Sequence, residues 1–283
     1  RPPSTTGRST ACSTPTPTPP PTLREKFAAF FTDEVVTDKT SYTSPYVSIQ
    51  ITKGRDKTHG SKEFNYYVAD IHLAEVGSLQ AGFPSAHRTG TVERMLKDNG
   101  AILAVNGDYY LNIHKGIIVR NGVVLQSEEG TNDICVLNRD GVMKTYTPGT
   151  YSAAEILESE PWQVWCFGPE LLDSEGRAKE EFNTSANIMK QNPRTAIGYY
   201  EPGHYCLVVI DGRLMGNSNG ASMKALSEFM ADLGCKAAYN LDGGASSGMA
   251  FDRKLISKPS GGGRAVSDVV MICEPEFMPF EEN

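Results

Sequence analysis

Three short apolar runs in this chain each stop at an aspartate beside a glycine. Residues 101–105 lead into Asn106-Gly107-Asp108, residues 205–210 into Asp211-Gly212, and residues 237–241 into Asp242-Gly243-Gly244. Runs this short and continuous are typical of strands buried on both faces. Polar groups at the rim of such strands are often functional, because the strand holds them rigidly. A hairpin turn is the alternative, and we favour the turn for Asp211-Gly212.

Strand and hairpin signals continue through most of the chain. The sequences Arg120-Asn121-Gly122 and Arg139-Asp140-Gly141 each separate two apolar segments, which indicates hairpins. Further strands are expected at residues 46–51, 64–76, 163–172, 193–200 and 265–273, and helices at 23–36, 91–99, 153–158 and 223–233. The last helix separates two apolar strands, as in a strand–helix–strand crossover. The sequence therefore predicts an α+β (mixed α/β) fold, a strand-rich single catalytic domain with several hairpins and three or four helices.

Composition limits the protein class and suggests a division of the chain. The 283 residues are 39% apolar, which is enough for a sizeable core. A net charge of −7 argues against a nucleic-acid partner, and no apolar run is long enough for a transmembrane segment. Residues 1–22 are expected to form a Pro/Thr-rich tether, residues 23–40 a short amphipathic helix or stalk, and residues 41–283 the catalytic domain.

The tether suggests an extracellular or cell-surface location, and its alternative is a disordered terminus. We expect any signal peptide or anchor to lie upstream of Arg1. The six cysteines form no Cys-x-x-Cys motif, and the five histidines lack the spacing of a zinc hydrolase. We expect no required cofactor, although clustered Asp and Asn oxygens could bind Ca²⁺ or Mg²⁺. Disulfide pairing and oligomeric state are not readable from the sequence.

Four segments in this order resemble the phosphodiester glycosidase family, and in particular its members from Gram-positive bacteria. They are Val105-Asn106-Gly107-Asp108-Tyr109-Tyr110, Asn192-Pro193-Arg194-Thr195-Ala196-Ile197-Gly198, Asn240-Leu241-Asp242-Gly243-Gly244-Ala245-Ser246-Ser247 and Arg264-Ala265-Val266-Ser267. Each motif is weak alone, but four in sequence are specific. Ala245 departs from a glycine common in the family. Animal members tend to have a second glycine in place of Asp108, so that aspartate is not a universal catalytic residue.

The resemblance implies hydrolysis of a sugar-1-phosphodiester at the glycosidic C–O bond. The leaving phosphate is a weak base, so it needs charge stabilisation more than protonation, and arginine suits that role. Asp242 is the expected nucleophile or base, with Asp108 and Asp211 competing for a second catalytic role. The expected substrate-binding residues are Asn106, Gly107, Arg194, Thr195, Asn240, Gly243, Gly244, Ser246, Ser247 and Arg264.

Within that set, the backbone amides of Gly243 and Gly244 and the hydroxyls of Ser246 and Ser247 could form a nest for the phosphate. The two asparagines could hold sugar hydroxyls or orient Asp242. Structural salt bridges are the alternative role for the two arginines. Tyr109 and Tyr110 could stack on a sugar or fill a core.

The sequence therefore predicts a hydrolase acting on a cell-wall, capsular or other extracellular glycan that carries a sugar-1-phosphate diester, with N-acetylglucosamine as the model sugar. Two alternatives stay open. A metal-dependent phosphodiesterase would use the same acidic residues to cut the P–O bond. A non-catalytic glycan-binding or wall-assembly module would bind a glycan polymer without turnover.

Overall fold

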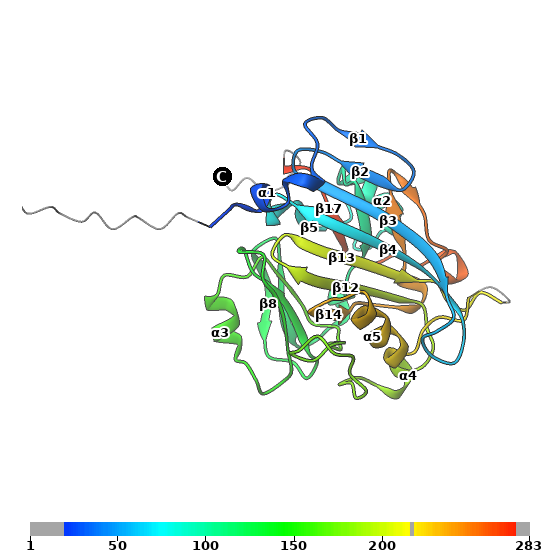
Figure 1. The fold of residues 1–283 in the computed structure, drawn as a ribbon. Coiled ribbons are helices and arrows are strands. Elements are labelled where there is room, and N and C mark those ends of the chain that lie inside the picture. The colour runs from blue at the N-terminus through cyan, green and yellow to red at the C-terminus, as the bar shows by residue number, and fades with distance from the viewer. Residues whose placement is uncertain (1–19, 216–217, 276–283) are drawn as a thin grey trace, which may run out of the picture.

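The computed structural model describes residues 20–215 and 218–275, so the tether predicted for residues 1–22 lies almost wholly outside it. The described residues form five α-helices and seventeen β-strands in three antiparallel sheets (Figure 1). This confirms the strand-rich α+β class. Five helices are found rather than three or four. Helix α1 (Leu23–Lys26) lies within a predicted helix, and the additional one is α4 (Ala186–Met189), a single turn too short to show periodicity. No helix in this part of the chain is long and apolar enough to cross a membrane.

The largest sheet has seven strands and forms the centre of the molecule (Figure 1). In spatial order they are β1 (Val36–Thr37), β2 (Ser41–Thr43), β3 (Val47–Asp56), β4 (Phe64–Leu73), β13 (His204–Ile210), β12 (Arg194–Glu201) and β14 (Ala237–Asn240). Strand β13 is apolar from Tyr205 to Ile210 because both of its faces are covered there. Tyr205, Leu207 and Val209 pack in one core cluster, and the alternate residues Cys206, Val208 and Ile210 pack in another.

The connection from β13 to β14 is the predicted crossover. Both strands pair antiparallel with β12, so they run in the same direction on either side of it. Helix α5 (Met223–Asp232) makes the connection and buries Met223, Leu226, Phe229 and Met230. Its N-terminus is capped by Ser222, whose hydroxyl accepts the Ala225 amide. Figure 1 shows α5 lying over β12 and β14.

The two smaller sheets have five strands each. One has the order β10 (Met143–Tyr146), β9 (Ile134–Leu137), β11 (Gln163–Trp165), β7 (Gly116–Arg120) and β8 (Val123–Glu128), and it contains both predicted hairpins. The other has the order β16 (Lys254–Leu255), β15 (Met249–Phe251), β6 (Leu103–Asn106), β17 (Val269–Ile272) and β5 (Leu79–Gly82). The remaining helices are α2 (Val92–Asp98) and α3 (Ala153–Glu158), both at predicted positions.

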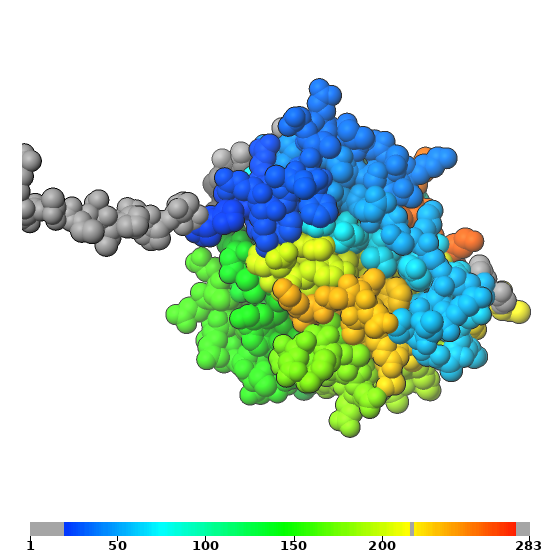
Figure 2. Space-filling view, viewed as in Figure 1, coloured from blue at the N-terminus to red at the C-terminus, as the bar shows by residue number. Residues whose placement is uncertain are grey.

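The helix predicted for residues 23–36 is much shorter than expected. Helix α1 ends at Lys26, a 3₁₀ turn follows at Ala28–Phe30, and the chain joins the large sheet at β1. Phe27 is only 5% exposed and packs edge-on against His72 and His204. The ring of Phe27 is buried directly against the sheet, whereas Phe30 stacks on His72 and stays 46% exposed, so a long helix is not needed to cover the buried ring. Figure 2 shows this dark-blue segment lying against the yellow turn between β12 and β13.

Candidate active site

Strand register brings the predicted site segments together. Ala196 of β12 pairs with Asn240 of β14, so the end of β14 lies beside the start of β12. The Leu241 amide then donates to the Thr195 carbonyl at 2.8 Å, and Asp242 follows directly. Two segments almost fifty residues apart in the sequence therefore place Asp242 near Arg194.

Asn106, at the end of β6, connects the five-stranded sheet that contains β6 to the ends of β12 and β14 in the large sheet. Its side chain is fully buried, and its Nδ2 donates to the Asp242 carbonyl at 2.7 Å. Its Oδ1 accepts from the Thr195 hydroxyl at 2.7 Å and from the Gly248 amide at 3.2 Å. Asn106 therefore orients the backbone of Asp242, which is one of its two predicted roles. Thr195 is buried in the same network and does not line the pocket described next, so its position does not support substrate binding.

A pocket of about 310 Å³ opens where these segments meet. It is lined by Phe167, Asn187, Ile188, Asn192, Arg194, Arg213, Asp242, Gly243, Gly244, Ala245 and Arg264. Its volume is at the lower end of the range of small-molecule sites. Of the predicted catalytic aspartates, only Asp242 faces this pocket.

The carboxylate of Asp242 is held from both sides. Its side chain is 9% exposed and forms an ion pair with Arg264, Nη2 to Oδ2 at 2.7 Å. Its Oδ1 accepts the Gly243 amide at 2.8 Å. Arg264 is itself fixed, because its Nε donates to the Ser246 hydroxyl at 2.8 Å and its guanidinium lies 4.9 Å from the Tyr109 ring centre. Tyr109 has a φ of 64°, an unusual conformation for a tyrosine that is typical of functional sites.

The predicted phosphate nest at the glycines is not formed. The Gly243 amide is taken by Asp242, and the Gly244 amide donates to the Pro193 carbonyl at 3.0 Å. A Cβ at Gly243 would lie 2.9 Å from that carbonyl, so close approach of two backbones explains the glycine. The hydroxyl of Ser246 accepts a hydrogen bond from Arg264. The hydroxyl of Ser247 is buried without a hydrogen-bond partner in the described structure. Arginine side chains, rather than backbone amides, supply the positive groups of the pocket.

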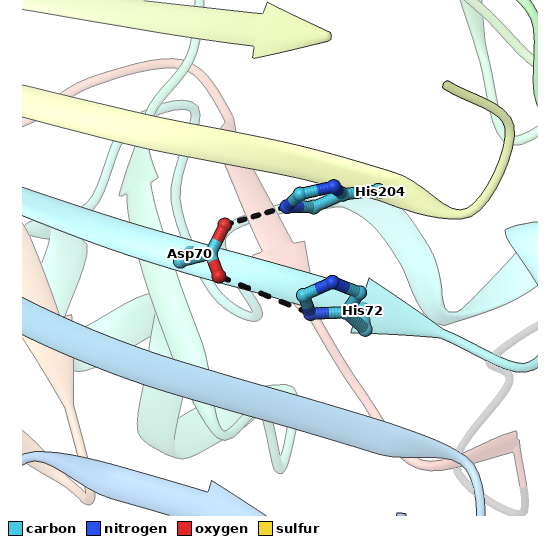
Figure 3. Close-up of side chains that lie close together, drawn as sticks. All are labelled: Asp70, His72 and His204. Carbon is cyan, nitrogen blue, oxygen red and sulfur yellow. Dashed lines mark hydrogen bonds and ion pairs between the residues drawn. The ribbon is translucent and has the colours of Figure 1, made fainter. Parts of the chain in front are cut away.

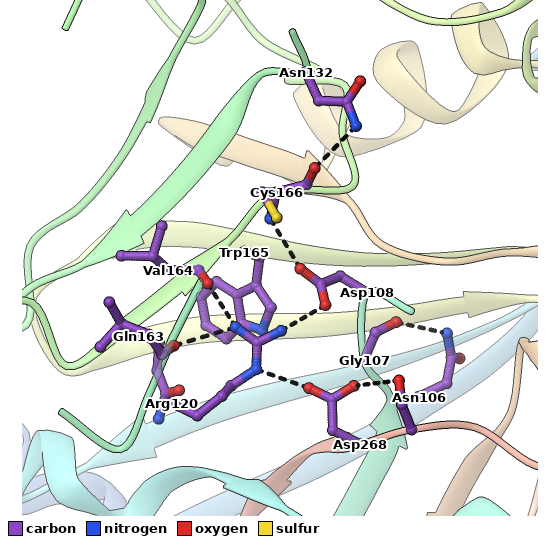
Figure 4. A network of polar contacts seen from close by, with 12 residues as sticks. Asn106, Gly107, Asp108, Arg120, Asn132, Gln163, Val164, Trp165, Cys166 and Asp268 are labelled. Carbon is purple, nitrogen blue, oxygen red and sulfur yellow. Dashed lines mark hydrogen bonds and ion pairs between the residues drawn. The ribbon is translucent and has the colours of Figure 1, made fainter. Parts of the chain in front are cut away.

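Asp108 lies outside the pocket, in a fully buried polar network (Figure 4). Its carboxylate pairs with Arg120 at 2.5 Å and accepts the Cys166 amide at 2.8 Å. Arg120 also pairs with Asp268, Nε to Oδ2 at 2.8 Å. Burial raises the pKa of Asp108, and the neighbouring Arg120 opposes that shift. The predicted role of Asp108 as a second catalytic carboxylate is not supported, because this geometry gives it a structural role.

Asp211 also has a structural role and does not line the pocket. Its two carboxylate oxygens accept the Lys258 amide at 2.9 Å and the Tyr67 hydroxyl at 3.2 Å. Burial raises the pKa of this carboxyl. The side chain of Asn240 is likewise internal and donates to the Gly168 carbonyl at 2.8 Å. Neither residue lines the pocket, so their predicted catalytic and substrate-binding roles are not supported by position.

Possible metal-ligand atoms gather elsewhere in the described chain. Asp70, His72 and His204 place one ligand atom each within 4.8 Å of one another (Figure 3). His204 of β13 pairs with Glu201 at one end of β12, whereas Arg194 lies at the other end of β12. The group is therefore separated from Asp242 by the length of a strand.

Six of the lining residues were not among the predicted site residues, and two of these six, Asn192 and Arg213, are hydrogen-bonded to each other. Arg213 lies in the segment that we interpreted as a turn, and its Nη2 donates to Asn192 Oδ1 at 2.6 Å. Asn192 begins the second family-like motif, which gave it a signal in the sequence. Arg213 had no such signal, because only the fold brings it opposite Gly244.

These features define a strand-rich α+β domain with a pocket in which three arginines and one carboxylate lie together. Sequence comparison gives the family: the chain belongs to the phosphodiester glycosidases, whose family model matches residues 99–273. This family is one of glycosidase-type hydrolases.

Individual relatives agree with that membership. The chain is 27% identical to mouse N-acetylglucosamine-1-phosphodiester alpha-N-acetylglucosaminidase over 70% of its own length and 43% of the relative. It is 28% identical to the uncharacterised protein YomE, derived from the SPbeta prophage of Bacillus subtilis, over 66% of its length and 30% of the relative. The chain thus matches less than half of either curated relative.

Solved structures show the same fold. The catalytic domain of the zebrafish N-acetylglucosamine-1-phosphodiester alpha-N-acetylglucosaminidase superposes with a TM-score of 0.66 at 21% identity, covering 85% of this chain and 88% of the other. A hypothetical protein from Synechocystis superposes with a TM-score of 0.64 at 14% identity, covering 81% and 62%.

Proposed function

We propose that this protein hydrolyses a sugar-1-phosphodiester at the bond between the anomeric carbon and oxygen, on an extracellular glycan. The observation that carries the proposal is one carboxylate, Asp242, facing a pocket whose other ionisable lining residues are three arginines. Such a pocket carries a net positive charge, which favours a phosphodiester by its sign, and offers a carboxylate to act on the sugar. The names of the mouse and zebrafish relatives supply N-acetylglucosamine as the sugar to test first.

In the proposed reaction a water oxygen forms a bond to the anomeric carbon. The bond from that carbon to the phosphate oxygen breaks, and its electron pair stays on the phosphate. Asp242 acts as the base that takes the proton of water, or as a nucleophile that forms a glycosyl ester. In the second case water then displaces Asp242 from the anomeric carbon, and the proton of water passes to the released phosphate. The arginines stabilise the charge that develops on the leaving phosphate.

A single carboxylate is sufficient for this chemistry. Glycosidases with alcohol leaving groups need a second carboxyl as an acid, because an alkoxide is a strong base. A phosphate monoester leaves as a weak base, so guanidinium groups can replace the acid. This removes the need for Asp108 or Asp211 in the reaction, in agreement with their buried, fully engaged side chains.

The test is turnover of UDP-N-acetylglucosamine in ¹⁸O water by the wild type, Asp242→Asn and a control, Asp252→Asn. Asp252 is exposed and lies outside the pocket. We expect ¹⁸O in the released sugar, a loss of at least about 100-fold in Asp242→Asn, and an unchanged control. The anomer of the product then separates the two roles of Asp242, since a base gives inversion and a nucleophile gives retention.

Other outcomes would overturn the proposal. Label in the phosphate, with loss of activity in EDTA, would show a metal-dependent phosphodiesterase that cuts the P–O bond. Binding of wall or capsular polymers without any release of sugar would show a glycan-binding module. The extracellular location is part of the proposal and rests on the Pro/Thr-rich segment at residues 1–22. Cell fractionation with an antibody against the protein would test it.

A further inference from the structure

The charges around the pocket are not balanced. Among its described lining residues, Asp242 is the one carboxylate, and it is already paired with Arg264 at 2.7 Å. Arg194 and Arg213 line the same pocket, and in the described structure neither has a carboxylate within ion-pair distance. Two positive charges therefore remain on this wall without an anionic partner.

Arg194 is the more constrained of the two. It is 2% exposed, and its Nε donates to the Ala221 carbonyl at 2.9 Å, while its Nη2 donates to the carbonyls of Ile188 and Lys190. These bonds fix the guanidinium but do not neutralise it. Burial, with a smaller contribution from Arg213, lowers the pKa of Arg194 to about 10, so it stays charged at neutral pH. A buried cation without an anion is costly, and a site that retains one is suited to an anionic ligand.

Arg213 faces the same space from a different segment. Its backbone has a φ of 57°, and its guanidinium lies 3.4 to 3.5 Å from the position that a Cβ would take on Gly244. Its Nη2 donates to the neutral side-chain amide of Asn192. Arg213 is exposed, and its charge lowers the pKa of Arg194, so the two cations repel each other in the absence of ligand. A ligand with more than one negative charge would neutralise both guanidinium groups.

Building on the proposed function, we propose that the preferred substrate is a sugar attached through a diphosphate rather than through a single phosphate. A phosphodiester carries one negative charge and would leave one of the two arginines unpaired. A diphosphate diester carries two, one on each phosphorus, which matches two guanidiniums on one wall. Arg213 then determines specificity for the second phosphate, and Arg194 serves the phosphate that carries the sugar.

The test compares two substrates that differ only in the second phosphate. They are N-acetylglucosamine linked at its anomeric carbon to methyl phosphate and to methyl diphosphate. An additional charge-assisted contact predicts a 10- to 100-fold higher kcat/KM for the diphosphate. Arg213→Gln should lower that ratio about tenfold. Arg253→Gln is the matched control, because Arg253 is exposed, also has a positive φ (64°) and lies outside the pocket.

A binding experiment separates failure of this inference from failure of the proposed function. Dimethyl phosphate and P1,P2-dimethyl diphosphate, which lack the sugar, are titrated into the protein and followed by amide NMR. We expect the diphosphate to bind at least tenfold tighter to the wild type and to Arg253→Gln, and the preference to fall below about threefold in Arg213→Gln. Equal affinities in the wild type, or a preference that survives in Arg213→Gln, would overturn the inference even if sugar is released. Absence of turnover on both substrates, with the binding preference intact, would instead reject the hydrolase.

Discussion

The Asn106-Gly107-Asp108 motif shows how residues that resemble a binding loop can serve packing. Asn106 connects two sheets through its side-chain amide, and Asp108 neutralises the buried Arg120. Gly107 lies between them, and a Cβ there would come 2.2 Å from Oδ1 of Asp268. The glycine predicted to bind substrate is therefore needed for the approach of a carboxylate from the same protein.

Replacing Gly107 with alanine should be strongly destabilising. Asp268 cannot move away freely, because its other oxygen pairs with Arg120 at 2.8 Å. We expect a loss of about 3 kcal/mol in the free energy of unfolding, from overpacking and a disturbed buried ion pair. Gly248→Ala is the control, since its Cβ would meet only ordinary contacts at 3.5 Å and beyond. Urea denaturation of both variants checks this, and equal losses would contradict the explanation.

At this scale the sequence identified some site residues and not others. Asp242, Arg194 and Arg264 were predicted, and all three line the pocket. Asp108 and Asp211 were predicted on the same pattern of a strand end beside a glycine. Their partners, such as Arg120 and the Lys258 amide, come from other strands and loops. A local pattern cannot tell a carboxylate that faces a pocket from one that is already paired.

At the scale of elements, the longer strands were predicted, short strands such as β1, β5 and β16 were not, and the first helix was predicted too long. Strand β13 is a continuous apolar run because two core clusters cover it. The segment at residues 23–36 has helical spacing, yet Phe27 packs on the histidines of β4 and β13, and Phe30 packs on the histidine of β4. Tertiary packing replaced a helix whose intrinsic stability is low at this length.

That packing should make stability depend on pH. His72 lies between the rings of Phe30 and His204, with centroid distances of 3.7 and 4.0 Å. Burial, then the charge of His204, lowers the pKa of His72 to about 4, against the opposing effects of Asp70 and Glu201. The folded state therefore disfavours the proton that the unfolded chain binds below its pKa of about 6.5. The stability is fully present above that value and is lost as the pH falls towards 4.

Lowering the pH from 8 to 5 should reduce the free energy of unfolding by roughly 2 kcal/mol through His72. The measurement is the free energy of unfolding in urea at both pH values for the wild type, His72→Asn and the exposed control His87→Asn. His72→Asn should lose less stability than the wild type on acidification, while His87→Asn follows the wild type. A parallel fall in all three proteins would show that the ring stack tolerates the proton.

At the scale of the molecule, polar side chains connect sheets whose order the sequence did not reveal. Hairpins such as β7–β8 were predicted because their strands are adjacent in the chain. The placement of β6 between β15 and β17 was not, because these pairings join residues more than 140 positions apart. Arg120 of β7 reaches from one sheet to Asp108 and Asp268, which flank strands of another (Figure 4).

Removing this arginine should therefore weaken the whole fold. Arg120 is fully buried, and it also donates to the Val164 carbonyl of β11 at 2.5 Å. Arg120→Met leaves two buried carboxylates without a cation, for which we expect a loss of about 3 to 5 kcal/mol at neutral pH. The loss should shrink as the pH falls to 5, because burial raises the pKa of Asp108 and this carboxylate can then be neutralised by a proton.

The triple variant Asp108→Asn, Arg120→Met and Asp268→Asn separates charge from packing. If uncompensated charge causes the loss, this variant should recover most of the stability, since no buried ion remains. Arg139→Met is the control, because Arg139 is exposed and stacks on Trp162 at 5.2 Å from the ring centre. An Arg120→Met deficit that is the same at pH 5 and pH 7.5, and is not relieved in the triple variant, would show that the arginine acts by shape alone. The sheets would then be held together by their apolar contacts, and the buried ions would have no net role in joining them.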